Sequence, residues 1–158
     1  MFWLEKTYEV SYRQFEDIEK SLRKVADLVR QKGREILTHF PITPPQFVAL
    51  QWLNEYGDMT IGELSDRMHL ACSTTTDLID RMEKMSSCQE LKMESDRRVV
   101  RIHLKTKGQE IILEVIKKRQ HYLAEMLEDF SCEQVNILEE NLSMLLETMK
   151  TKREIRSE

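Results

Sequence analysis

The sequence predicts a mainly α-helical chain with one small β-hairpin, and three observations support this. Its 158 residues contain only four Gly and three Pro, with 41% hydrophobic and 33% charged residues, a composition that suits a helix-rich globular domain. Apolar residues recur at three- and four-residue steps through most of the chain, the period of a buried helix face. Residues 99–104 instead contain the alternation of apolar and polar side chains typical of a strand. A chain of this length is most simply one domain, residues 1–158.

A first long helix is predicted over residues 9–38, and its apolar side chains have the spacing of a helix–helix seam. The seam residues are Phe15, Ile18, Leu22, Val25 and Val29. Packing onto the chain's own core is the alternative, and for this helix taken alone it is the simpler explanation.

The next helix begins with Thr43–Gln46, after a loop over residues 39–42. Thr at the cap, Pro at the first helical position and Gln at the third form a capping box. Its predicted buried face is Phe47, Leu50 and Leu53, and it ends at Tyr56–Asp58. Trp52 could stack on a ligand, but packing inside the protein is the simpler role for a tryptophan here.

Residues 60–85 have the pattern of two short helices joined by a tight turn near His69. The first helix opens with a capping box of Thr60 and Glu63 and places Ile61, Leu64 and Met68 on one face. The second covers residues 73–84, with Leu78, Ile79 and Met82 turned inward. Its first turn, Ser73–Thr76, is a run of hydroxyls that helix propensity does not favour. In a DNA groove such hydroxyls can reach phosphates and base edges.

Residues 88–104 have the pattern of two strands joined by the charged loop Glu94–Arg98. From Lys92 to Lys107 there are six cations and two anions, although the whole chain carries a net charge of −4. A basic hairpin can therefore attract phosphates without a cationic protein overall. Helix, turn, helix and an arginine-tipped hairpin make a winged helix-turn-helix over residues 43–104.

Two long helices are predicted after the hairpin. Thr106 and Gln109 have the spacing of a capping box, and the helix they open carries an apolar stripe of Ile111, Ile112, Val115, Ile116, Leu123, Met126 and Leu127. Ser131 and Gln134 open the last helix, whose seam residues are Val135, Leu138, Leu142, Leu145 and Met149. Seam-like helices at both ends of a small chain favour termini that pack together across a two-fold axis.

The central segment resembles the MarR family of dimeric bacterial transcription regulators over roughly residues 42–108. The residues that carry the resemblance are Thr43–Gln46, Met59–Leu64, Ser73-Thr74, Asp80–Lys84 and Asp96–Val100. The resemblance implies that residues 9–38 and 106–152 form a dimerisation region and that the winged lobe binds DNA. It also implies release by a small, often aromatic or anionic, effector bound where the dimerisation region meets the winged lobe.

The candidate DNA-binding residues are Thr43, Ser73, Thr74, Thr75, Thr76, Arg81, Lys84, Asp96, Arg97 and Arg98. The start of the second predicted helix of the helix-turn-helix would approach the major groove. Arg81, which matches the family's Asp-Arg pair, and Lys84 can reach phosphates, although Lys84 is equally well explained as a solvated surface charge. By the resemblance, Asp96 orients Arg98 for insertion into the minor groove and Arg97 adds phosphate attraction. The alternative for these wing residues is a structural salt bridge within the hairpin.

Four departures from the family pattern affect the DNA-binding expectation. Asp77 is acidic where a basic or polar residue is common, so it costs affinity unless it pairs with Arg81 or accepts from a cytosine amino group. Ala71 replaces a polar cap, so Ser73 is expected to cap the helix instead. Residues 85–88 lack the usual Gly, which disfavours the left-handed helix end and puts the first wing strand in doubt. The fourth departure is the acidic Glu90 in that strand.

Other functional classes find little support in the sequence. Three Cys residues without paired spacing argue against a disulfide framework, and four scattered His residues argue against a metal site. Cys72 is the best candidate for oxidant sensing, but family members that sense oxidants carry that cysteine in the first helix, which has none here. No phosphate loop or nucleophile motif is present, so we expect neither an enzyme nor a cofactor. Without a signal peptide or an apolar run of ~18 residues, a cytoplasmic protein is expected.

The sequence therefore predicts a homodimeric, sequence-specific DNA-binding transcription regulator, most often a repressor in this family. A two-fold dimer predicts a pseudo-palindromic operator in double-stranded DNA, with half-sites separated by about one helical turn, ~10 bp. The alternative is a winged-helix module for protein interaction or dimerisation whose DNA binding is weak or lost, which the acidic net charge and Asp77 favour.

Overall fold

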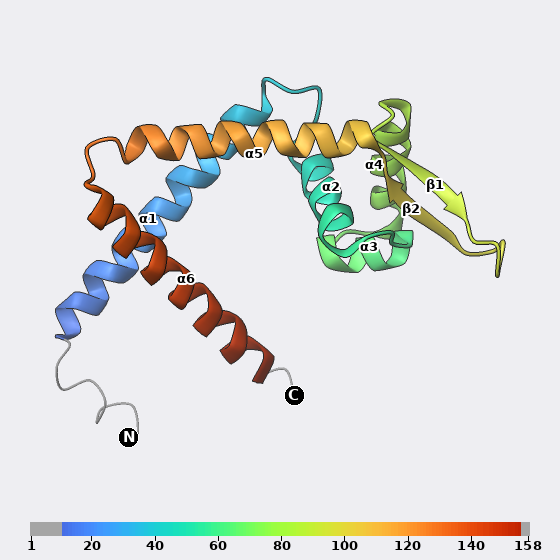
Figure 1. Ribbon diagram of the computed structural model, residues 1–158. Helices are drawn as coiled ribbons and strands as arrows, with labels where there is room; N and C mark the ends of the chain where they lie inside the picture. The colour runs from blue at the N-terminus through green and yellow to red at the C-terminus, as the bar shows by residue number, and fades with distance from the viewer. Residues whose placement is uncertain (1–10, 156–158) are drawn as a thin grey trace. The chain divides into compact units, whose positions relative to one another are not determined.

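The computed structural model describes residues 11–155, which form six helices and one two-stranded antiparallel sheet (Figure 1). In chain order the elements are α1 (Tyr12–Leu37), α2 (Pro44–Tyr56), α3 (Ile61–Met68), α4 (Cys72–Lys84), β1 (Cys88–Lys92), β2 (Val100–Leu104), α5 (Thr106–Met126) and α6 (Cys132–Ile155). This confirms the predicted fold class, a mainly helical winged helix-turn-helix. The predicted start of the first helix at residue 9 lies outside the described residues. The chain divides into two compact units, residues 1–119 and 120–158.

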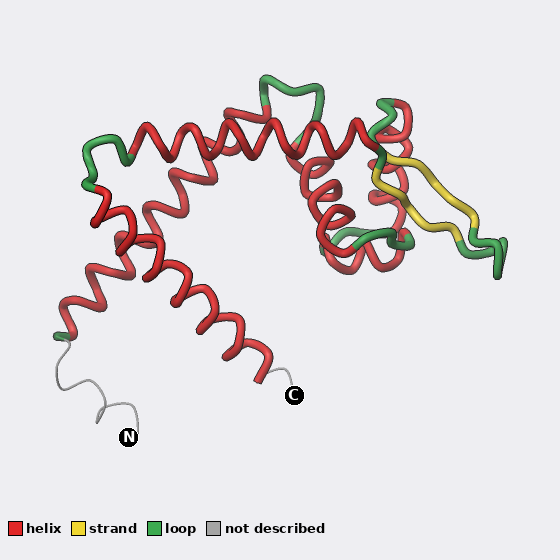
Figure 2. Tube along the Cα trace, in the orientation of Figure 1, coloured by secondary structure: helices red, strands yellow, loops and turns green. Residues whose placement is uncertain are grey.

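In the first unit, α2, α3 and α4 pack against one another, and the hairpin of β1 and β2 extends from them (Figure 2). Its core draws on residues 36–115 and includes the predicted face of α2 in full; of the faces predicted for α3 and α4, Leu64, Ile79 and Met82 are buried, whereas Ile61, Met68 and Leu78 are partly buried against the core. The buried hydrophobic residues are Ile36, Leu37, Ile42, Phe47, Ala49, Leu50, Leu53, Met59, Leu64, Ile79, Met82, Cys88, Ile102, Leu104, Ile111, Ile112 and Val115. Trp52 packs against the edge of this core, as the simpler interpretation predicted.

Three predicted capping boxes set the starts of helices α2, α3 and α6. At α2 the Thr43 backbone N–H donates to Gln46 Oε1 at 2.9 Å, and at α3 the Thr60 N–H donates to Glu63 Oε2 at 2.8 Å. The return bond at α3 runs from the Glu63 N–H to Thr60 Oγ1 at 3.1 Å. Ser131 makes the same pair of bonds with its partner three residues on. Each box satisfies donors that a helix start otherwise leaves without partners.

The fourth predicted box is wrong. Helix α5 begins at Thr106 itself, and the Gln109 N–H donates to the Lys105 carbonyl at 3.1 Å. Lys105 therefore holds the cap position. The Lys105 N–H donates to the Ser87 carbonyl at 3.1 Å, so the backbone of Lys105 is bonded to the residue that precedes β1. Tertiary packing thus shifts this helix start by one residue from the position that the local pattern favoured.

The end of α4 takes a left-handed turn without the glycine that such turns favour. Ser86 has φ of 59°, and the N–H groups of Ser86 and Ser87 donate to the carbonyls of Glu83 and Met82 at 2.8 and 3.1 Å. These are the two bonds of a Schellman motif. The buried Ser87 hydroxyl also donates to the Met82 carbonyl, at 2.9 Å. The doubt about the first wing strand is thereby removed, since β1 forms and pairs in register from Cys88–Leu104 to Lys92–Val100.

The hairpin is joined to the helices through a third extended segment. Met59, in the connection between α2 and α3, forms an antiparallel bridge with Ile102 of β2. The Ile102 N–H donates to the Met59 carbonyl at 2.7 Å, and the Met59 N–H donates back at 3.3 Å. Both side chains are buried. The base of the hairpin is therefore part of the core, whereas its connecting loop is exposed.

Most residues of the seams predicted on the first and last helices are exposed in the single chain, and Val135 and Leu138 of α6 are half-buried. The five seam residues of α1 are between 41% and 55% exposed. On α6, Leu142, Leu145 and Met149 are 49%, 39% and 59% exposed, and the helix has no buried residue. None of the helices within residues 11–155 contains an apolar stretch that could span a lipid bilayer.

Candidate nucleic-acid interface

Helix α4 buries one face and leaves the opposite face open. Thr75, Ile79 and Met82, at four- and three-residue steps, are 0%, 0% and 1% exposed. The open side includes five of the predicted DNA-binding residues, namely Ser73, Thr74, Thr76, Arg81 and Lys84. Helical geometry puts Asp77 near the middle of this open face.

The prediction that Thr75 contacts DNA is wrong. Its side chain is fully buried, and its hydroxyl donates to the Ala71 carbonyl at 3.2 Å. The hydroxyl of Thr76 similarly donates to the Cys72 carbonyl at 2.9 Å, but that side chain remains exposed. Four consecutive residues span more than one helical turn, so one of the four hydroxyls had to face the core.

The prediction that Ser73 caps this helix is also wrong. The helix begins at Cys72, Ala71 takes the cap position, and no side chain caps it. Ser73 lies inside the first turn with its side chain exposed. The first-turn N–H groups therefore lack a side-chain acceptor, and such a helix start attracts anions, including phosphate. The preceding turn places His69 in the left-handed conformation, with φ of 54°.

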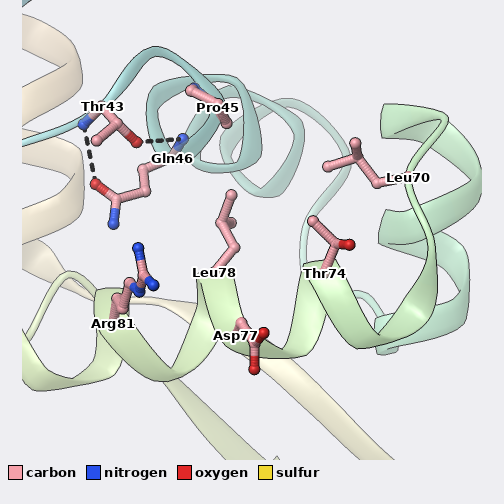
Figure 3. A pocket seen from close by; sticks show the side chains of 8 residues that line it. All are labelled: Thr43, Pro45, Gln46, Leu70, Thr74, Asp77, Leu78 and Arg81. Atoms are coloured by element: carbon pink, nitrogen blue, oxygen red, sulfur yellow. Dashed lines mark hydrogen bonds between the residues drawn. The ribbon is translucent and has the colours of Figure 1, made fainter.

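A shallow cavity of about 300 Å³ lies between the start of α2 and the side of α4 (Figure 3). Its lining residues are Thr43, Pro45, Gln46, Leu70, Thr74, Asp77, Leu78 and Arg81. Three of the predicted DNA-binding residues, Thr43, Thr74 and Arg81, thus come together around one cavity. Gln46 was predicted only as a capping residue. In Figure 3 its side chain makes the predicted bond with Thr43 and also faces Arg81, and no local sequence signal indicates this second neighbour.

Asp77 and Arg81 do not form the ion pair that their spacing allows. Among the described residues, neither side chain has an ion-pair partner within 4.0 Å. Figure 3 shows the Asp77 carboxylate directed away from the cavity and the Arg81 guanidinium directed toward Gln46. Arg81 therefore remains free to bind an anion. That Asp77 accepts from a cytosine remains a prediction.

At the wing tip, Asp96 orients the backbone rather than a guanidinium. The Arg98 N–H donates to Asp96 Oδ1 at 3.0 Å, and the Val99 N–H donates to the Asp96 carbonyl at 3.0 Å. Within the described chain, the guanidinium groups of Arg97 and Arg98 have no ion-pair partner, and both residues are exposed. The alternative of a structural salt bridge within the hairpin is therefore not formed. Two positive groups at the tip are left for an external anion.

The Glu83 carboxylate has a local structural role beside the wing. The Glu90 N–H donates to the carboxylate of Glu83, which ties β1 to α4. Carboxylate oxygens of Glu83, Glu90 and Asp80 lie within 4.8 Å of one another. Burial, together with Glu83 and Glu90, raises the pKa of the Cys88 thiol to about 12. Cys72 is exposed at the first position of α4 and Cys132 is exposed at the start of α6.

The winged lobe matches a known family. The model of the MarR family matches residues 42–100. The uncharacterized HTH-type transcriptional regulator YsmB of Bacillus subtilis is 61% identical over 136 residues, which are 86% of this chain and 93% of YsmB.

Two solved structures extend the similarity over most of the chain. A MarR family protein from Bacillus stearothermophilus is 53% identical, with a TM-score of 0.78 over 89% of this chain and 99% of that one. Transcriptional regulator Tm0710 from Thermotoga maritima is 31% identical, with a TM-score of 0.77 over 87% of this chain and 96% of that one. The similarity therefore includes the long helices as well as the lobe.

Proposed function

This chain belongs to the MarR family of helix-turn-helix transcriptional regulators, and we propose that it acts as a homodimer on an operator in double-stranded DNA. One observation carries the proposal. The open face of α4 and the tip of the wing present Arg81, Arg97 and Arg98, which have no ion-pair partner within residues 11–155, next to exposed hydroxyls. Unpaired arginines beside hydroxyls suit phosphate and base edges, and no enzymatic role is needed to account for them.

Helix α4 would enter the major groove by its first turns. Ser73 and Thr74 are exposed there, and the uncapped helix start favours a phosphate nearby. Arg81 and Thr43, which face the same cavity, would bind the sugar–phosphate backbone and hold the register. Asp77, in the middle of the open face, would select against phosphate contact and for a cytosine amino group.

The wing would bind the adjacent minor groove through Arg98. The Asp96 carboxylate holds the backbone N–H of Arg98, so the loop is ordered while the guanidinium stays free. An arginine in that position gains most from the negative potential of a narrow A·T-rich minor groove. Arg97 would add attraction to the flanking phosphates.

Two copies would pair through α1 and α6. Ten apolar seam residues lie on these helices, and those of α1 are 41% to 55% exposed in the single chain. A continuous apolar stripe on each terminal helix is costly to leave in water, and a second copy would cover it. The two-fold axis would then present two α4 helices to a pseudo-palindromic operator with half-sites about 10 bp apart.

Repression with release by a small ligand completes the proposal. A small aromatic or anionic effector would bind where the dimerisation helices meet the lobe and favour a lobe spacing that no longer fits successive grooves. This part rests on membership of the family, in which repression is the common outcome. The DNA target implies a cytoplasmic protein.

The proposal is tested by titrating the purified protein with the DNA upstream of its own gene, across a series of salt concentrations. We expect a dimer by sedimentation, tight binding to one site, and an affinity that falls steeply with salt because phosphate contacts release counterions. Arg98→Ala should weaken binding about tenfold or more, since each dimer loses two groove contacts. Lys118→Ala, which removes an exposed cation from α5, serves as the matched control and should change little.

Weak binding that is indifferent to sequence would contradict the proposal. It would favour the protein-interaction module, with Asp77 as the reason that DNA affinity was lost.

A further inference from the structure

Arg101 differs from the other basic residues of the wing. Of the six cations between Lys92 and Lys107, all within the described residues, it alone donates side-chain hydrogen bonds. Its Nη1 donates to the Asp58 carbonyl at 2.8 Å, and its Nε donates to the Met93 sulfur at 3.3 Å. The side chain is 35% exposed. A guanidinium that is hydrogen-bonded to a backbone carbonyl would have to break that bond before it could bind a phosphate.

The same guanidinium also reaches the start of α3. Arg101 Nη1 lies 3.7 Å from Glu63 Oε2, and that same carboxylate oxygen accepts the Thr60 N–H at 2.8 Å. The bond from Thr60 and, to a smaller extent, the charge of Arg101 lower the pKa of Glu63, which keeps the carboxylate ionised. An exposed ion pair of this kind stabilises little by itself. Its effect here is geometric, because it joins strand β2 to the first turn of a helix of the helix-turn-helix.

A second contact holds the neighbouring position of β2. His103 lies two residues beyond Arg101, on the same face of the strand, and its Nδ1 is 2.8 Å from Asp58 Oδ1. The backbone bridge between Met59 and Ile102 lies between these two contacts. Three successive residues of β2 are thus attached to the connection between α2 and α3. An isolated two-stranded hairpin is marginal in water, so such attachments decide where the wing points.

We propose that Arg101 is a positioning residue for the wing: it sets the direction of the hairpin relative to α4 and does not itself contact DNA. The inference rests on the proposed function, since it concerns how the wing arginines reach their groove. The tip residues Arg97 and Arg98 lie beyond the last ladder pair, Lys92–Val100. Arg101 pairs with Leu91, one pair before that end of the ladder, so its bonds hold the hairpin close to the tip arginines. Losing them would displace the tip, and contacts of a functional site tolerate only small displacements.

A double-mutant cycle on operator binding tests this role. Arg101→Met keeps the apolar stem of the side chain but removes the donors, and Arg98→Ala removes the tip contact. We expect Arg101→Met to weaken operator binding; in a background that already carries Arg97→Ala and Arg98→Ala it should leave the slope of log Kd against log salt unchanged, because Arg101 makes no phosphate contact of its own. We also expect Arg98→Ala to cost at least about threefold less in the Arg101→Met background than in the wild type, because the two residues act in one unit.

Two further variants keep the result interpretable. Arg101→Lys keeps the charge but cannot bond Asp58, Met93 and Glu63 together, so it should weaken binding and reduce the cost of Arg98→Ala in the same direction. This variant replaces Arg101→Met if thermal unfolding shows that the latter is not folded at the assay temperature. Lys92→Met, which removes an exposed cation of β1, is the matched control and should leave the cost of Arg98→Ala unchanged.

The experiment distinguishes a failure of the proposed function from a failure of the positioning role of Arg101. If the wild type binds no specific site, the proposed function and the role of Arg101 fall together. If the wild type and Arg98→Ala behave as the proposed function requires, but the two substitutions are additive, only the positioning role is refuted. A smaller salt slope when Arg101→Met is added to the Arg97→Ala and Arg98→Ala background would also refute it, because Arg101 would then contact phosphate directly.

Discussion

Gly108 lies in the first turn of α5, where that helix packs against the turn that follows α4. A Cβ atom added there would lie 2.4 Å from the Ser87 carbonyl oxygen and 2.6 Å from Leu104 Cδ1. The Ser87 carbonyl already accepts the Lys105 N–H at 3.1 Å, so it cannot move away without losing that bond. Gly108→Ala should therefore separate α5 from the turn that ends α4.

The expected destabilisation follows from two opposing effects. Ala is favoured over Gly inside a helix by about 1 kcal/mol. Overpacking a tight contact costs ~1–3 kcal/mol, and a clash with backbone at 2.4 Å belongs at the upper end. The net loss in the free energy of unfolding is about 2 kcal/mol, which corresponds to a fall in Tm of ~4–8 °C for a chain of this size. The sign is opposite to the one that helix propensity alone predicts.

Thermal and urea unfolding at one fixed protein concentration measure this change, since association shifts the apparent stability. Gly62→Ala in α3 is the matched control, because its added Cβ would meet only Thr60 Oγ1, at 3.8 Å. That variant should match the wild type or gain up to about 1 kcal/mol. The steric argument is refuted if Gly108→Ala is as stable as the wild type or more stable.

Two further predictions concern the buried side chains of Cys88 and Thr75. In the native protein Cys72 and Cys132 should react with a thiol reagent and Cys88 should not, because burial raises the pKa of that thiol to about 12. The Cys88 thiol of the unfolded chain ionises near pH 8.5, well below the folded protein, so the free energy of unfolding should fall as pH rises from about 8.5 toward 12, by up to ~1.4 kcal/mol per pH unit. Urea unfolding at several pH values measures this fall, and Cys88→Ala should not show it. In DNA titrations Thr75→Val should bind as the wild type does, because that hydroxyl faces the core, whereas Thr74→Val should weaken binding. Equal effects of the two Thr substitutions would contradict the assignment of faces.

Much of the fold could be predicted from the sequence because its signals are local. A capping box is complete within four residues, so Thr43 and Thr60 marked their helix starts without knowledge of the rest of the chain. The three- and four-residue apolar spacing identified the buried faces of α2 to α4, and the arginine-tipped loop identified the wing. Of the candidate site, the open face of α4 and the free arginines of the tip follow from this reasoning.

Three features were decided only by tertiary structure: the burial of Thr75, the left-handed turn at Ser86 and the bonds of Arg101. The run of hydroxyls could not say which member faces the core, and the packing of Ile79 and Met82 turned Thr75 inward. The turn at Ser86 takes a left-handed conformation that serine alone does not favour, because the Schellman bonds and the buried Ser87 hydroxyl stabilise it.

Arg101 shows the physical reason most clearly. By sequence it is one of six wing cations, yet its partner Asp58 lies 43 positions away along the chain. The identity of a residue states which bonds it can make, and this much the sequence determines. Which bonds are made depends on what the fold brings within about 3 Å, and for Arg101 that is the connection between α2 and α3 rather than open solvent.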